Sequence, residues 1–247
     1  MFMTLRSLSL ALFLPGVLAA CTSLTERRSA TVRFKVEVTL RQNGLQKTGK
    51  AVWSYTLRRP AIQLVSSYDV DLYAEAIPIP LQNGLVAFVL PIGRVYSAPP
   101  NQWLEDAFLP LEERQDAIRI ASLHNLSLRV GERKTIACFN NPQDSDRIRS
   151  KRFIFYCPQI LTTKDLNNPR TLQIADFEQE SGGGAGISVT KLKITITDEP
   201  PTNVLERWLP WLKSAQNRPL ARDAQNNINW KLDSAIHHLR FPFERDS

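Results

Sequence analysis

The fold is decided by residues 31–58, which read TVRFKVEVTLRQNGLQKTGKAVWSYTLR. Apolar and polar residues alternate through residues 31–40 and again through residues 51–58, which is the pattern of strands with one buried face. Asn43-Gly44 lies between the two runs, and this dipeptide tolerates positive φ at both positions of a tight turn. The stretch therefore predicts an antiparallel hairpin.

A second hairpin is predicted farther along the chain, and we expect it to be central in the sheet. Its turn is Gln82-Asn83-Gly84, which leads into the continuous apolar segment Leu85–Leu90. Because that segment does not alternate, it predicts a strand covered on both faces. The run before the turn does alternate, with Tyr68, Val70, Leu72, Ala74 and Ala76 expected inside and Ser67, Asp69, Asp71, Tyr73 and Glu75 expected in solvent.

Helical spacing replaces the alternation between Pro99 and Leu123. A first helix is predicted after an Asn101 cap, and a second helical stretch is predicted from Pro110. The apolar positions are Trp103, Leu104, Ala107 and Phe108 in the first helix and Leu111, Ile118 and Ala121 in the second.

Strands are predicted again at residues 134–139, 152–156 and 171–175, before a glycine-rich loop at residues 181–186. In the next strand the apolar residues change parity between Val189 and Leu192, so we expect a bulge near Thr190-Lys191 that restores one apolar face. Asn203 and Glu206 have capping-box spacing, which predicts a helix that Pro210 kinks. A final helix is predicted within residues 228–239.

These elements predict an α+β fold, built mainly on an antiparallel sheet with a helical insertion and C-terminal helices. The chain has 247 residues, of which 43% are hydrophobic, and this suffices for a sizeable core. We expect residues 1–20 to be a signal peptide, residues 21–30 a tether and residues 31–247 a single domain. Residues 1–6 carry one cation and precede the apolar run Leu8–Leu18, which is too short to span a bilayer.

The residues Leu18-Ala19-Ala20-Cys21 resemble the lipobox of bacterial lipoproteins. The resemblance implies diacylation of Cys21, with palmitate as a typical chain, cleavage before Cys21 and N-acylation of the new terminus. Thr22 stands where lipoproteins retained in the inner membrane often have Asp, which favours the periplasmic face of the outer membrane. The alternative is an ordinary secretory signal peptide. Residues 22–30 reach roughly 30 Å when fully extended, so the folded part is expected close to the lipid.

The body of the chain resembles a group of small, uncharacterised proteobacterial envelope lipoproteins. The resemblance rests on residues 74–79 with 85–90 and on residues 196–200 with 209–212. It implies the fold and the location, and it implies no activity.

The charge balance is mildly basic. The formal net charge is +7, and cleavage before Cys21 removes only Arg6. On a membrane-tethered protein this favours anionic lipid or an anionic glycan over nucleic acid, for which the sequence has no motif. The run Arg147, Arg149, Lys151 and Arg152 is the predicted anion-binding segment, with a solvated loop as the alternative.

Cys138 and Cys157 are predicted to form a disulfide, since an exported protein enters an oxidising compartment. The alternative is two buried, unpaired thiols. No catalytic residue, metal site or cofactor is assigned. His237-His238 with Asp233, Asp69 with Asp71 and the glycine-rich loop are each better explained as solvated surface.

We therefore expect a non-catalytic, lipid-anchored binding or structural module of the cell envelope. Its expected partners are the membrane, through the acyl chains on Cys21, and an envelope protein or an anionic glycan. The alternative from another class is an envelope hydrolase that lacks a recognisable motif. A third hypothesis is a structural subunit of a secretion or assembly machine, which predicts a large exposed apolar patch.

Overall fold

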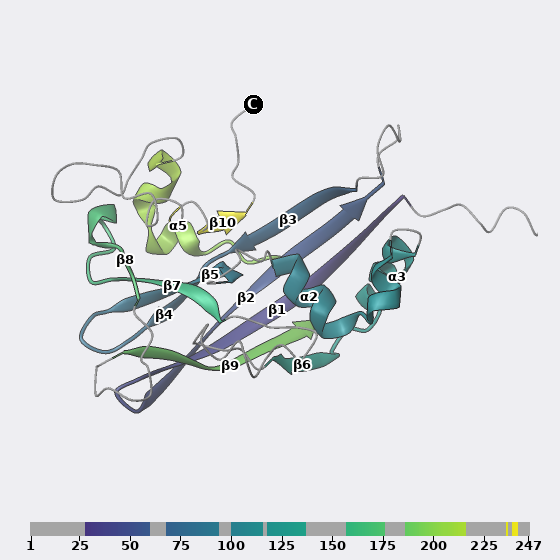
Figure 1. Ribbon diagram of the computed structural model, residues 1–247. Helices are drawn as coiled ribbons and strands as arrows, with labels where there is room; N and C mark the ends of the chain where they lie inside the picture. The colour runs from purple at the N-terminus through teal and green to yellow at the C-terminus, as the bar shows by residue number, and fades with distance from the viewer. Residues whose placement is uncertain are drawn as a thin grey trace, which may run out of the picture.

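The structure is a computed structural model that describes residues 28–59, 68–93, 100–115, 118–136, 157–175, 186–215, 236 and 239–241. The described residues form two antiparallel sheets with short helices around them (Figure 1), so the predicted α+β class is confirmed. The six-stranded sheet contains, in spatial order, β10 (Arg240–Phe241), β3 (Asp69–Glu75), β2 (Leu45–Arg58), β1 (Ser29–Gln42), β9 (Ile187–Ile196) and β6 (Arg133–Ile136). The four-stranded sheet contains β4 (Ile77–Pro80), β5 (Val86–Gly93), β7 (Pro158–Thr163) and β8 (Gln173–Ile174).

The helical elements are short. They are α2 (Pro100–Phe108), η1 (Leu111–Arg114), α3 (Arg119–Ser127), η3 (Pro169–Thr171), α5 (Leu205–Trp208) and η4 (Pro210–Ala215). Among the described residues, no helix is both long enough and apolar enough to cross a bilayer.

The predicted hairpin at residues 31–58 is confirmed. β1 and β2 pair in one unbroken register from Ser29 opposite Arg58 to Gln42 opposite Leu45. Asn43 and Gly44 both have positive φ, at 50° and 77°, as a two-residue turn with matching strand twist requires. The local sequence is therefore sufficient to specify this hairpin.

The predicted bulge in the strand at residues 187–196 is also confirmed. Val189 lies opposite Leu40 and Lys191 lies opposite Thr39, so Thr190 is the extra residue on β9. The bulge lets Val189 and Leu192 both point into the core although their separation is odd.

The second predicted hairpin is correct at its turn and wrong in its first strand. Residues 67–76 were expected to pair with residues 85–90, but β3 pairs with β2 and only β4 pairs with β5. Pro78 and Pro80 lie in β4, an edge strand, where a residue without an N–H group is tolerated. The chain thus changes sheets at Ala76.

Two side-chain environments expected for this run are wrong. Val70 was expected inside and is 52% exposed, because it lies at the outer end of β3, which β2 alone pairs there. Glu75 was expected in solvent and is fully buried, because it lies where the chain turns into the second sheet.

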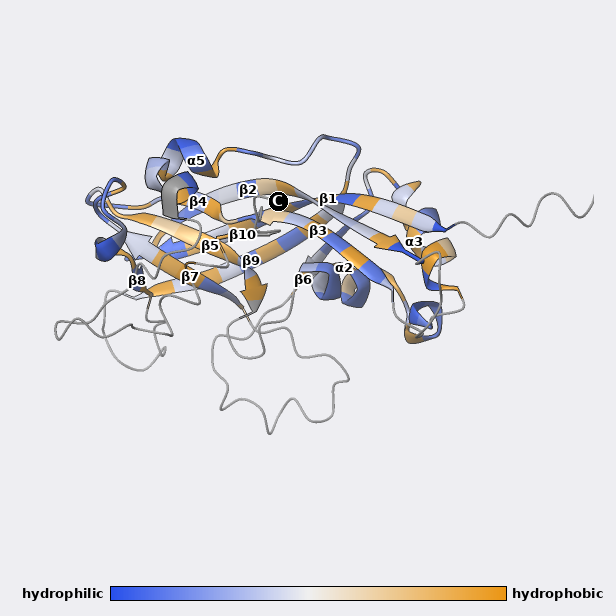
Figure 2. Cartoon of the chain, turned by 90° about the horizontal axis from the view of Figure 1, so that it is seen from above, coloured by the Kyte–Doolittle hydropathy of each residue, from blue (hydrophilic) through white to orange (hydrophobic). Residues whose placement is uncertain are grey.

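The expected burial of residues 85–90 on both faces is confirmed from Val86 onward. Alternate residues of β5 contribute to two different hydrophobic clusters, so this strand is apolar throughout whereas β3 shows alternating bands (Figure 2). The first core cluster lies between the two sheets and includes Phe34, Trp53, Ile79 and Val89. The second core cluster covers the opposite face of the four-stranded sheet and includes Phe88, Leu161, Leu205 and Leu209.

Gly49 determines how closely the two sheets approach. It lies on β2 opposite Val38, on the face that β4 crosses. A Cβ atom added at Gly49 would lie 2.5 Å from Ile79 Cγ1 and 2.7 Å from Ile77 Cγ2, distances that real Cβ contacts do not show. The missing side chain therefore makes room for β4.

The helical insertion is confirmed, but its cap and its second half were predicted wrongly. α2 begins at Pro100, so Asn101 lies inside the helix. The chain is extended at Gln115 before α3 begins, so the helical spacing counted from Pro110 does not continue into α3. Leu111, Ile118 and Ala121 are consequently exposed, whereas Ile120, Leu123 and Leu126 are buried.

Two of the remaining predicted elements are partly described. The strand expected at residues 134–139 is present as β6 over its described part, and the strand expected at 171–175 is reduced to β8 after a turn of 3-10 helix. The strand expected at residues 152–156 lies outside the described residues, as does most of the final helix. β7 was not predicted. Five of its six residues are buried, so its sequence lacks the alternation of apolar and polar residues that marks a strand with one exposed face.

We expect Gly49→Ala to lower the free energy of unfolding by about 1–3 kcal/mol, because one extra methyl group overfills a packed core. Chemical denaturation measures this loss. The matched variant is Gly49→Ala combined with Ile79→Ala, in which the nearest clashing atom is absent. The two changes should then be strongly non-additive. Strictly additive losses would contradict the assigned contact.

Candidate functional site

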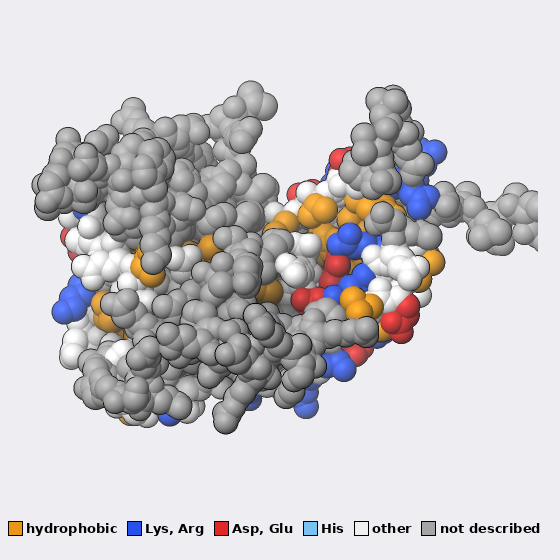
Figure 3. Space-filling view, viewed as in Figure 1, with side chains coloured by type: hydrophobic (Ala, Val, Ile, Leu, Met, Phe, Trp, Pro, Cys, Tyr) orange, Lys and Arg blue, Asp and Glu red, His pale blue; other side chains and the backbone are white. Residues whose placement is uncertain are grey.

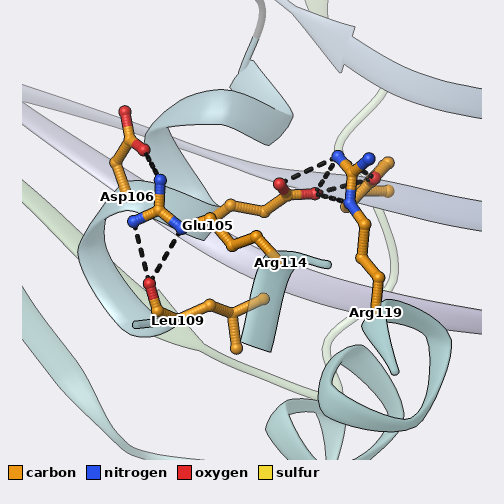
Figure 4. A network of polar contacts seen from close by, with 6 residues as sticks. Glu105, Asp106, Leu109, Arg114 and Arg119 are labelled. Atoms are coloured by element: carbon orange, nitrogen blue, oxygen red, sulfur yellow. Dashed lines mark hydrogen bonds and ion pairs between the residues drawn. The ribbon is translucent and has the colours of Figure 1, made fainter. Parts of the chain in front are cut away.

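The described part of the chain contains a buried ionic cluster between the helical insertion and β2 (Figure 4), and Glu105 is its centre. The guanidinium Nη2 of Arg119 donates to both carboxylate oxygens of Glu105, at 2.7 and 2.8 Å, and its Nε donates to Oε1 at 3.2 Å. The hydroxyl of Tyr55 donates to Oε1 at 2.8 Å. Three elements, β2, α2 and α3, are thereby joined at one carboxylate.

The residue of α2 that follows Glu105, Asp106, forms a second ionic pair. Arg114 pairs with Asp106, and its Nε and Nη2 atoms both donate to the carbonyl of Leu109, at 2.9 and 2.8 Å. Burial raises the pKa of Asp106, and the nearby charge of Arg114 offsets only part of that rise. This pair holds η1 against the C-terminal end of α2.

Local sequence explains how these side chains come to be buried. Trp103, Leu104 and Phe108 turn one face of α2 toward the sheet, and Glu105 follows directly on that helix. Tyr55 belongs to the inward set of β2, so its hydroxyl is carried into the core. A buried hydroxyl needs a hydrogen-bond partner, and this requirement is the sequence signal that could have identified the cluster.

The geometry of the cluster indicates that Tyr55 and Glu105 hold α2 and α3 in place on β2 and do not transfer a proton. Burial, and next the negative charge of Glu105, raise the pKa of Tyr55 far above its ordinary value, so this phenol stays protonated. Both oxygens of Glu105 already accept hydrogen bonds. Charged atoms surrounded by hydrophobic ones are visible on the surface over α2 and α3 (Figure 3).

Glu75 is a second buried carboxylate, and it caps α5. The backbone N–H groups of Val204 and Leu205 donate to its two oxygens, at 2.8 and 3.2 Å. The helix expected after Asn203 begins at Leu205, with Val204 as its N-cap residue, and side-chain acceptors for its first N–H groups come from β3. A reciprocal pairing of Asn203 with Glu206 stays a prediction. A carboxylate at this position also interacts favourably with the partial positive charge of the helix terminus.

The predicted site residues fall mostly outside the described residues. These are Cys21, Cys138 and the basic run at Arg147, Arg149, Lys151 and Arg152, whose roles stay predictions. The residues explained above as solvated surface also lie mostly outside the described residues, namely 181–185 of the glycine-rich loop, Asp233, His237 and His238.

One predicted site residue, Cys157, is described, as are Asp69 and Asp71, which were expected to lie on a solvated strand face. Cys157 is fully buried in the first core cluster, and its pairing with Cys138 stays a prediction. Asp69 and Asp71 lie on the exposed face of β3, where Arg58 donates to Asp71 at 3.0 Å. No group of three metal-ligating side chains occurs within the described ranges.

The outer face of the six-stranded sheet is rich in cations. The strand registers place alternate residues of β1, β9, β6 and the first half of β2 on this face, away from the first core cluster. Glu37 pairs with Lys193 there. The cations on these strands are Arg33, Lys35, Arg41, Lys50, Arg133, Lys191 and Lys193, and the acidic side chain on them is Glu37, with Asp198 and Glu199 in the segment that follows β9. Farther along the same face, Arg58 on β2 lies beside Asp69 and Asp71 on β3.

One segment crosses this outer face. After β9 the chain runs over β1 and β2 through residues 197–202, with Lys35 paired to Glu199 on the way. Thr202 then exchanges hydrogen bonds with the backbone of Val52, its N–H donating at 3.0 Å and its hydroxyl accepting at 3.2 Å. This crossing segment covers Val52 and leads the chain to α5.

No protein-family model, curated protein or solved structure matches this chain. The function proposed below therefore rests on this chain alone.

We expect the free energy of unfolding to fall as the pH rises above about 10, because unfolded tyrosine loses its proton there while folded Tyr55 keeps it. Denaturation at a series of alkaline pH values measures the slope. Tyr55→Phe should make the slope shallower, because the group whose pKa differs most between the folded and unfolded states is then absent. Equal slopes in the two proteins would contradict the assigned environment of Tyr55.

Proposed function

We propose that this protein is a lipid-anchored envelope protein whose folded body binds an anionic glycan without catalysis. The observation that carries the proposal is the cation-rich outer face of the six-stranded sheet. Its cations outnumber the acidic side chains among them, and Arg41, Lys50, Arg133 and Lys191 are each exposed. A face with one prevailing sign of charge suits an extended polyanion, which presents many charges at regular intervals.

The proposed anchor is the acylated Cys21. In support, the apolar leader, the small residues Ala19-Ala20 and Cys21 stand in the register of a lipobox. β1 begins at Ser29, so only seven residues separate Cys21 from the first strand. Two or three acyl chains on one residue anchor a protein stably, whereas one chain does so only marginally. The periplasmic face of the outer membrane is the proposed location.

We expect Cys21→Ser to abolish labelling by a radioactive fatty-acid precursor and to move the exported protein from the membrane to the soluble fraction, because no other residue is proposed to carry acyl chains. Cell fractionation and labelling measure both effects. The matched control is Cys157→Ser, which should keep the label. Continued labelling of the Cys21→Ser protein would reject the anchor.

The outer face is tested by neutralising part of it. Replacing the four exposed cations by Ser should weaken retention on immobilised heparin, a polyanionic glycan, on the order of tenfold at low salt, and less at high salt where screening is stronger. The variant changes Arg41, Lys50, Arg133 and Lys191. The control removes the same charge elsewhere and changes Lys164, Arg170, Arg207 and Lys213.

Two outcomes would move or reject the glycan site. Equal retention of the face variant and the control would reject the outer face. Loss of retention only when Arg147, Arg149, Lys151 and Arg152 are replaced would assign binding to the basic run instead. Both outcomes leave the proposed anchor unaffected.

A further inference from the structure

The exposed hydrophobic side chains of the described residues are unevenly distributed. Six large hydrophobic side chains are at least 44% exposed, namely Leu45, Val70, Leu111, Ile118, Leu128 and Val130. Four of them lie at the end of the six-stranded sheet where β1 begins, as shown below. Leu45 lies at the opposite end, beside the hairpin turn, and Leu111 belongs to η1.

The strand register places Val70 near the start of β1, and the packing of α3 places Ile118 there. Val70 lies opposite Leu57, which in turn lies opposite Ala30, the second residue of β1. Ile118 is the N-cap residue directly before α3, and α3 packs against β1. Figure 1 shows α3 beside the purple start of β1, and the rotated view in Figure 2 agrees.

Leu128 and Val130 follow α3 and lie at the same end. The next residue, Gly131, donates its backbone N–H to the carbonyl of Ile196 at 2.9 Å. Ile196 lies opposite Phe34, near the start of β1. Val70, Ile118, Leu128 and Val130 therefore mark one end of the molecule, which we call the tether end.

Chain length identifies what the tether end faces. From Cys21 to Ser29 the chain spans at most roughly 28 Å when fully extended. β1 itself has 14 residues and so extends for roughly 46 Å. An acylated Cys21 keeps the tether end within reach of the bilayer, while Leu45 lies near the far end of the hairpin.

We propose that the tether end inserts its aliphatic side chains into the headgroup layer of the membrane that holds the acyl chains, an inference that rests on the proposed anchor. Leu128 and Val130 are 69% and 55% exposed, and aliphatic side chains gain free energy when they enter the boundary of the acyl region. Arg129, between them, pairs with Glu132 at 3.6 Å and is 40% exposed. Its long stem lets the charged group stay in the polar surface of a bilayer while the neighbouring aliphatic side chains enter it. The partner of this surface is a lipid bilayer.

Site-specific photo-crosslinking in acylated protein on cell membranes tests the proposal. A benzophenone amino acid is placed singly at positions 118, 128 and 130 and, as a matched control, at position 45, where Leu45 is 52% exposed. We expect lipid adducts from the first three positions and none above background from position 45. Mass spectrometry of the irradiated protein identifies the adducts.

A second variant separates insertion from mere proximity to the tether. Leu128→Asp together with Val130→Asp should reduce the lipid adduct at position 118 by roughly tenfold, because two carboxylates oppose entry into the headgroup layer. Leu45→Asp should leave that adduct unchanged. Circular dichroism checks that both variants are folded.

The outcomes distinguish this inference from the anchor. Acyl labelling of Cys21 without lipid adducts at 118, 128 and 130 overturns the inserting surface and leaves the anchor intact. Adducts to another protein, or to a second copy of this chain, overturn it as well. Absence of acyl labelling overturns the anchor first.

Discussion

The close contact between Gly49 and the side chains of Ile77 and Ile79 is the constraint on which the rest of the structure depends. It lets β4 cross directly over β2, so the first core cluster can fill the space between two sheets. The six-stranded sheet thus covers one face of the four-stranded sheet. On the opposite face, α5 and Leu239 pack against the strands and complete the second core cluster. Packing at this density transmits any added volume to both clusters.

Two buried carboxylates bind the helices α2, α3 and α5 to the strands of the six-stranded sheet. Glu105 joins α2 and α3 to Tyr55 on β2, and Glu75 joins β3 to the start of α5. Each carboxylate accepts at least two hydrogen bonds, which offsets the cost of removing a charge from water. Removing one partner would leave a buried charge without compensation, so both groups specify one arrangement of helices.

Polar and apolar surfaces are separated in a way that suits a tethered protein. A cation-rich surface lies on the outer face of the six-stranded sheet, while four of the six large exposed aliphatic side chains of the described residues lie where β1 begins. If the tether end rests on the bilayer, as proposed, the long strands point away from the membrane. The cationic face then extends from the membrane into the periplasm, where an extended glycan can lie along it.

The sequence by itself determined the features that depend on neighbours in the chain. The alternation in residues 31–58, the Asn43-Gly44 turn and the parity change before Leu192 each predicted the observed structure, because a strand's period and a turn's φ angles are local properties. The lipobox resemblance likewise needs only four adjacent residues. Only the tertiary structure decided that Glu75 is buried, since its helix partner Val204 lies 129 residues away. The same holds for Glu105, Gly49 and Val70, whose surroundings are set by which sheet and which helix pack on them, and no local pattern encodes that choice.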